Sequence, residues 1–96
     1  MPERLLARLS ATEAPQGVLL VGRTPAQDAA ALDAAGPVLV LDGVQDPGNF
    51  GALVRSAVAF GAAAVLALPG TVDAWNPKAV RAAAGAGFRV PILSME

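Results

Sequence analysis

The sequence predicts a single α/β domain in which a parallel sheet alternates with helices. Three short apolar runs, rich in valine and leucine, lie at Val18–Val21, Val38–Leu41 and Ala64–Leu68. Continuous apolar runs of this length are typical of strands buried on both faces, as in parallel sheets. Because polar segments with helix signals separate the runs, the expected order is β-α-β-α-β-α, with a fourth strand at Arg89–Leu93.

The first expected helix follows the Val18–Val21 run. Thr24 is suited to cap its N-terminus, Pro25 to occupy the first helical position, and Gln27 to complete a capping box. Gly36, followed by a proline, ends this helix.

The next two helices begin with the same local signal. An aspartate or asparagine that can cap a helix precedes a proline at Asp46-Pro47 and at Asn76-Pro77. The expected end signals are Gly61 for the second helix and Gly85 or Gly87 for the third.

Composition limits the possible functions. The chain has 96 residues, of which 54% are hydrophobic and 16% charged, which suits one small domain with a buried core. It contains neither cysteine nor histidine, so disulfides, thiolate metal sites and histidine-based catalysis are excluded, and no metal is expected. Residues 1–14 are expected to form a separate leader and residues 15–96 the main domain.

The chain shows no signal for a membrane. Its apolar runs are far shorter than the roughly 18 residues that a spanning helix needs, and its first ten residues lack a signal-peptide core. We therefore expect a cytoplasmic protein.

Charge is unevenly distributed along the chain. The segment from Met1 to Asp46 has three basic and six acidic residues, whereas the segment from Pro47 to Glu96 has four basic and two acidic ones. A polyanion site is therefore expected in the second half.

Dinucleotide or ATP binding is the main alternative for an α/β domain of this kind. It would require G-x-G-x-x-G after the first strand, or a G-x-x-x-x-G-K-[ST] loop. Neither pattern occurs, because Gly22 leads into Arg-Thr-Pro and Gly48 and Gly51 have the wrong spacing.

The stretch LDGVQDPGNFGALVRSAVAFG, residues 41–61, has an unusual helix at its centre. Its apolar residues recur at helical spacing, whereas Gly51 and Arg55 lie one turn apart on what should be the opposite, uncovered side. A glycine inside a helix costs about 1 kcal/mol relative to alanine, so capping alone does not explain Gly51. The apolar stripe consists of Phe50, Leu53, Val54, Ala57 and Val58.

These residues resemble a known family. The stretch is similar to the first signature motif of the SpoU (TrmH-type) branch of the SPOUT RNA 2′-O-ribose methyltransferases, with Asn49, Gly51 and Arg55 at the family's spacing. The likeness extends upstream to APQGVLLVG and downstream to NPKAVRAAAGAGFRVPI, covering Thr12 to Ile92. One departure is the lack of the serine that the family commonly has near Ala82-Ala83-Ala84.

The resemblance implies a fold, an activity and a cofactor, and it implies that the leader, residues 1–14, is a remnant of an upstream RNA-binding domain. It implies the Rossmann-like N-terminal half of a trefoil-knot methyltransferase domain, with the knot itself absent from this sequence. The implied activity is S-adenosylmethionine-dependent 2′-O-methylation of RNA, either rRNA or tRNA, by a homodimer. Because the cofactor site would lie in the absent C-terminal part, the isolated chain is expected to be inactive. A noncatalytic RNA-binding or dimerisation remnant remains an alternative.

The resemblance also implies roles for individual residues. Arg55 would hold the phosphate of the target nucleotide. A guanidinium group keeps its proton near neutral pH and therefore cannot accept another one as a base. Asn49 would orient the ribose or Arg55, and Gly51 would leave room for the substrate. Cationic side chains that could extend the phosphate track, each equally explained as solvated surface, are Lys78, Arg81 and Arg89. Trp75 is expected to cover a loop, with stacking on a base as the alternative.

Overall fold

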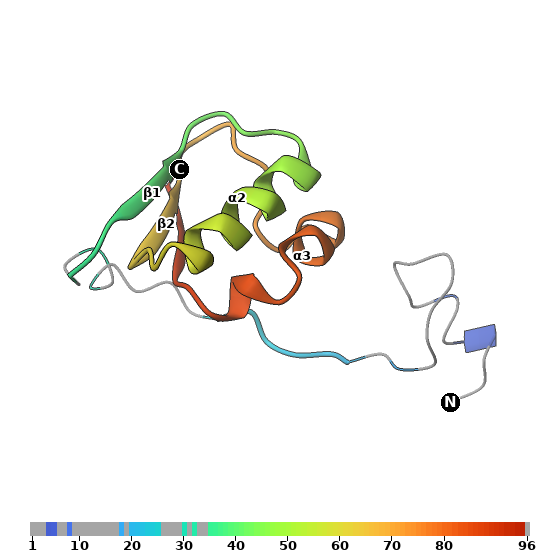
Figure 1. The fold of residues 1–96 in the computed structure, drawn as a ribbon. Coiled ribbons are helices and arrows are strands. Elements are labelled where there is room, and N and C mark those ends of the chain that lie inside the picture. Colours follow the sequence, from blue (N-terminus) through green and yellow to red (C-terminus); the bar gives the residue numbers. More distant parts are fainter. Residues whose placement is uncertain are drawn as a thin grey trace.

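A computed structural model describes residues 35–95 continuously, together with residues 4, 5, 8, 18, 20–25, 30 and 32. Within the continuous part, strands and helices alternate (Figure 1). In chain order these elements are β1 (Val38–Leu41), α2 (Pro47–Ala59), β2 (Ala64–Ala67), α3 (Pro77–Ala83), the 3-10 helix η2 (Ala86–Phe88) and β3 (Ile92–Ser94).

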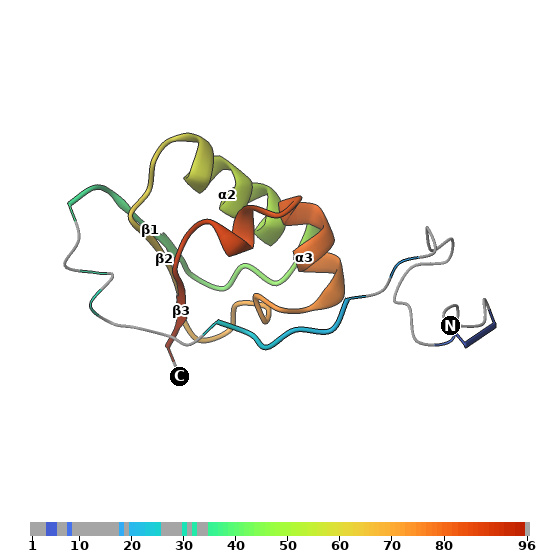
Figure 2. The same cartoon turned by 90° about the horizontal axis from the view of Figure 1, so that it is seen from below.

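The three strands form a parallel sheet in the order β1-β2-β3, with Leu39 opposite Val65 and Val65 opposite Ile92. Both crossovers move in the same direction along the sheet. Since parallel crossovers are right-handed, α2 and α3 must lie on the same face, as the two views show (Figure 1, Figure 2). The predicted α/β class with parallel strands is confirmed.

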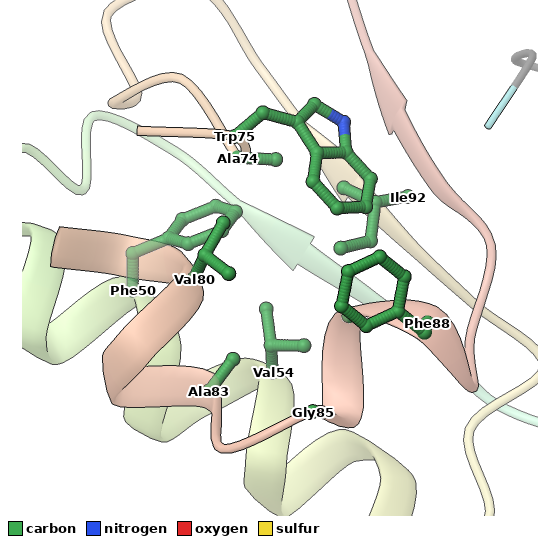
Figure 3. A pocket seen from close by; sticks show the side chains of 10 residues that line it. Phe50, Val54, Ala74, Trp75, Val80, Ala83, Gly85, Phe88 and Ile92 are labelled. Carbon is green, nitrogen blue, oxygen red and sulfur yellow. The ribbon is translucent and has the colours of Figure 1, made fainter. Parts of the chain in front are cut away.

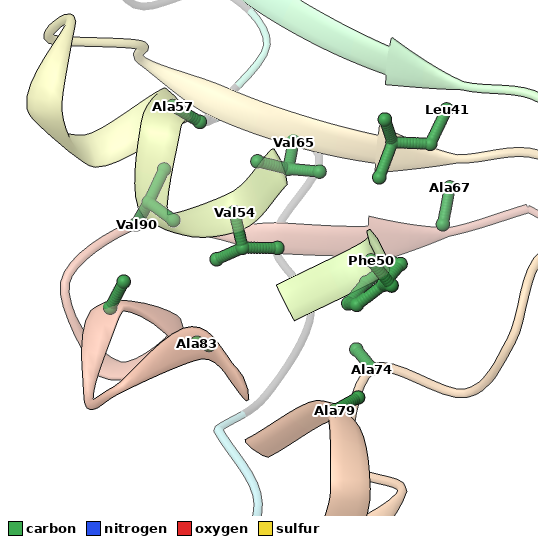
Figure 4. Close-up of a cluster of buried hydrophobic side chains, with 11 residues drawn as sticks. Leu41, Phe50, Val54, Ala57, Val65, Ala67, Ala74, Ala79, Ala83 and Val90 are labelled. Atoms are coloured by element: carbon green, nitrogen blue, oxygen red, sulfur yellow. The ribbon is translucent and has the colours of Figure 1, made fainter. Parts of the chain in front are cut away.

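The core lies between α2 and this face of the sheet (Figure 4). Phe50 and Val54 of α2 and Val65 of β2 are its largest fully buried side chains. Alanines from α3 and the loop before it close the far side of the cluster. Its buried members are Leu41, Phe50, Val54, Ala57, Val65, Ala67, Ala74, Ala79, Ala83, Ala86 and Val90.

The helix starts predicted at Asp46 and Asn76 are confirmed as hydrogen-bonded caps. The Asp46 carboxylate accepts a bond of 2.9 Å from the backbone N–H of Gly48, and the Asn76 side chain accepts one of 2.9 Å from that of Lys78. Each helix has proline in its first turn, where no N–H partner is needed. These caps fix where both helices leave the sheet.

The helix ends also lie close to their predicted positions. After α2, the chain turns at Gly61, whose φ is +75°. After α3, two consecutive residues are left-handed, Ala84 at φ +52° and Gly85 at φ +84°. Gly85 is therefore part of the predicted stop, but the first left-handed position holds an alanine, which this conformation disfavours.

The predicted strand at Val18–Val21 is wrong for its described residues. Val18, Leu20 and Val21 belong to no strand and are 73%, 88% and 94% exposed. An apolar run forms a strand only when another strand and a covering layer meet it, and the described residues supply neither here. The helix expected between Thr24 and Gly36 lies mostly outside the described residues, as does most of the leader.

The last strand begins three residues later than predicted and ends one residue later. The backbone N–H of Arg89 donates to Ala86 O at 2.9 Å, which keeps this residue in the 3-10 turn. Pro91 cannot donate to a neighbouring strand, so pairing through N–H groups begins after it.

The sequence predicted strands that are buried on both faces. This prediction fits β2 better than β1, in which the Val40 side chain remains 51% exposed. No helix among the described residues is long and apolar enough to span a bilayer.

Candidate RNA-contacting surface of helix α2

Asn49 lies in the first turn of α2, beside the loop that follows β1. Its side chain is exposed and borders an open groove of about 580 Å³ between this loop and one flank of the helix. Such loops at the carboxyl ends of parallel strands are where α/β sheets bind ligands. The groove is lined by Gly43, Val44, Gln45, Asp46, Asn49, Ala52, Leu53 and Ser56.

Arg55 is exposed on another flank of the same helix. It follows Asn49 by six residues, which corresponds to about 120° around the helix axis and about 9 Å along it. The groove lining includes Asn49 but not Arg55. The two predicted catalytic residues therefore lie on different flanks of α2, and the role of Asn49 in orienting Arg55 stays a prediction.

Gly51 is buried, and the prediction that it lies on an uncovered face is wrong. A Cβ atom at this position would clash with the Cβ of Ala82 and would lie 2.6 Å from Ala83 N and 2.7 Å from Ala82 C. The missing side chain is what lets α3 pack directly against α2. The space that glycine leaves is filled by α3, so it is not available to a substrate as the sequence suggested.

A signal for this contact is present in the sequence. Ala82 lies in a run of three alanines, and small residues facing a helical glycine permit close approach of two helices. The remaining stripe prediction holds, since Phe50, Val54 and Ala57 are buried and Leu53 packs against the core cluster.

The predicted cations of the second half are all exposed. Lys78 and Arg81 lie on α3, which packs beside α2, whereas Arg89 follows η2. Lys78 precedes Ala82 by one helical turn and so lies on the side of α3 that meets α2. Arg81 lies about 100° around the helix from Ala82.

Trp75 packs against the core cluster, whereas the sequence favoured a tryptophan that covers a loop. Its ring lies 5.6 Å from that of Phe88 at a tilt of 46°, and Ile92 lies beside both rings (Figure 3). The hollow beneath has a volume of only about 10 Å³, room for about one water molecule. This aromatic pair is therefore packing. Phe88, 68% exposed, was not singled out from the sequence, although an aromatic residue in a glycine-rich turn was a usable signal.

Comparison with known proteins agrees with the motif. The model of the SpoU rRNA Methylase family matches residues 36–96, most of the chain. The chain belongs to this family. The predicted family membership is thereby confirmed.

Curated relatives are rRNA methyltransferases by name. The chain is 39% identical over 93 residues to the 23S rRNA (guanosine(2553)-2′-O)-methyltransferase RlmP of Bacillus subtilis, covering 97% of this chain and 36% of that protein. It is 51% identical over 57 residues to rRNA methyltransferase 3, mitochondrial, of Mus musculus, covering 59% of this chain and 14% of that protein. The chain thus spans about a third or less of these relatives.

Solved structures share the fold. A TrmH-family protein from Porphyromonas gingivalis matches with a TM-score of 0.74 and 34% identity, covering 100% of this chain and 38% of that one. The SpoU methyltransferase AviRb from Streptomyces viridochromogenes, in complex with AdoMet, matches with a TM-score of 0.67 and 30% identity, covering 74% of this chain and 28% of that one. The fold of this chain is therefore part of a SpoU-type methyltransferase domain.

Proposed function

We propose that this chain is the part of an rRNA 2′-O-ribose methyltransferase that presents the RNA-contacting surface of helix α2. The observation that carries the proposal is that the Asn49–Arg55 motif lies on α2, the helix that begins beyond the carboxyl end of β1, with Asn49 in its first turn. The side chains of Asn49 and Arg55 are both exposed on this helix, so packing of the core does not require them. The names of the relatives favour rRNA over tRNA as substrate.

Arg55 is the residue best suited to bind a phosphate. An arginine side chain presents a positively charged, planar fork of donors that matches two phosphate oxygens. As the ribose 2′-hydroxyl loses its proton during methyl transfer, a fixed positive charge stabilises the growing negative charge. Lys78 and Arg81, on the neighbouring helix, would extend the contact along the RNA backbone.

Asn49 is better suited to the ribose than to Arg55. Its side-chain amide can both donate and accept, which matches a sugar hydroxyl. It borders the groove and stands on a different flank from Arg55. Of its two predicted roles, orienting the ribose is the one that this geometry supports.

S-adenosylmethionine is the cofactor of the proposed reaction and supplies the methyl group. The described residues do not fit the whole molecule. An open hollow of about 530 Å³ lies where β2 and β3 end, but the Thr71 hydroxyl there donates to Leu41 O at 3.1 Å, and the Asp73 carboxylate accepts from Trp75 N at 3.0 Å. The described residues that line it include no cation to meet the carboxylate of the cofactor. The rest of the site is expected beyond residue 96.

The homodimer and the cytoplasmic location stay predictions. A dimer would cover apolar side chains that are exposed in the described part of the chain, such as Val40 and Phe60, which are 51% and 85% exposed. Names of relatives do not decide the compartment, because one is mitochondrial.

The test is a methylation assay with the full-length enzyme that contains this segment. Labelled S-adenosylmethionine and 23S rRNA should yield labelled RNA in which one phosphodiester bond resists alkaline cleavage, because its 2′-hydroxyl is methylated. Binding of the RNA without transfer of label would instead favour a noncatalytic RNA-binding protein. Label on a base, with every phosphodiester bond still cleavable, would contradict ribose methylation.

A further inference from the structure

Gly51 lies where α2 packs directly against the backbone of α3. The neighbours that a Cβ atom would meet include Ala83 N and Ala82 C, at 2.6 and 2.7 Å. Both are backbone atoms, which cannot turn aside as a flexible side chain would. Any side chain at position 51 must therefore push α3 away from α2.

Two cations from different helices lie next to this contact. Arg55 follows Gly51 by one turn of α2, and Lys78 precedes Ala82 by one turn of α3, so each lies on the side of its own helix that meets the other. Both side chains are exposed. The separation of the helices at Gly51 therefore sets where these two positive charges stand relative to each other.

We propose that Gly51 is a positioning residue for methyl transfer. By holding α2 against α3, it places Arg55 and Lys78 so that both contact phosphates of the same bound RNA strand. This inference rests on the proposed function, because it takes Arg55 as the phosphate-binding residue. It assigns Gly51 a role through the protein backbone, without contact with the RNA.

A purely structural role would have different consequences. If Gly51 served only the stability of the fold, its replacement would reduce the folded fraction but leave each folded molecule fully active. If it positions the two cations, each folded molecule loses rate as well, since a misplacement of about 1 Å can cost about 10²-fold.

The first experiment compares Gly51→Ala with Val54→Ala in the full-length enzyme. Val54 is fully buried in the same helix, so its truncation weakens packing without forcing the helices apart. With rates corrected for the folded fraction, Gly51→Ala should lower kcat about 10–100-fold, whereas Val54→Ala should stay within about twofold of the parent enzyme. Equal rates per folded molecule for both variants would overturn the proposal.

A binding measurement gives a readout that stability does not affect. Each phosphate neutralised on single-stranded RNA contributes about 0.7 to the slope of log K against log salt. Gly51→Ala should reduce the magnitude of this slope by about 0.7, since one of the two cations no longer reaches its phosphate. An unchanged slope, as expected for Val54→Ala, would contradict the positioning role.

A double-variant cycle tests whether Gly51 acts through Arg55. Once Arg55→Ala has removed the phosphate contact, adding Gly51→Ala should cost less than about threefold further, so the two losses are not additive. Full additivity would overturn the inference. If Gly51→Ala does not fold, Ala82→Val enlarges the same contact from the other helix. It should show the same pattern with a loss of about 5–10-fold, and normal kinetics for it would also overturn the inference.

The outcomes separate this inference from the function on which it rests. Normal turnover by Arg55→Ala would reject the phosphate role of Arg55 and the positioning role together. Slow turnover by Arg55→Ala with normal turnover by Gly51→Ala would reject the positioning role alone.

Discussion

The two flanks of α2 differ in what surrounds them. On one flank Gly51 is covered by α3, and Arg55 emerges one turn further on, beside that contact. On the other flank Asn49 borders an open groove and has the loop after β1 as its neighbour. The motif that looks like one catalytic face in the sequence is thus divided among a packing position and two separate exposed positions. Sequence spacing alone cannot distinguish these roles.

The largest effect is expected from changing the geometry of the charge at Arg55. Arg55→Lys keeps a positive charge but loses the planar fork, so turnover should fall about 10²–10³-fold, the scale of losing one preorganised donor. Single-turnover methylation assays with saturating RNA would measure this rate. A lysine variant with more than about a third of the parent rate would show that charge alone is sufficient.

A smaller loss is expected on the groove flank. Asn49→Ala removes a neutral hydrogen-bonding group, so turnover should fall about 10-fold, the kinetic equivalent of one hydrogen bond. Asn49→Asp keeps the size but replaces the donor with a negative charge that repels RNA, and it should be slower than Asn49→Ala. The same kinetic assay ranks the two variants, and the reverse order would exclude a donor role for the Asn49 amide.

The local parts of this structure are the ones that sequence predicts well. The caps at Asp46 and Asn76 depend on hydrogen bonds between residues two positions apart, so the local sequence is enough to identify them. The prediction of a strand at Val18–Val21 was wrong because a strand needs a partner from elsewhere in the chain. The prediction that Gly51 is uncovered was wrong for the same reason, because the residues that cover it lie about 30 positions later.

The smallest expected effect concerns the end of α3. Ala84 adopts φ +52°, a left-handed conformation that an alanine reaches only at a cost, whereas glycine reaches it freely. Ala84→Gly should therefore raise the free energy of unfolding by about 0.5–1 kcal/mol, measured by urea titration. Ala52→Gly, inside α2, is the matched control and should lower it by about 1 kcal/mol. Destabilisation by both changes would contradict the left-handed end of α3.

The central claim is that α2 carries residues for packing and, separately, an exposed arginine for function. Measuring turnover and stability together for Arg55→Ala tests this claim most directly. Because Arg55 is exposed and outside the core, its loss should change the free energy of unfolding by no more than about 0.5 kcal/mol. Turnover should nevertheless fall about 10²–10³-fold, whereas Arg23→Ala, another exposed arginine, should change neither quantity. Near-normal turnover by Arg55→Ala would make Arg55 an ordinary surface residue and contradict the proposed function.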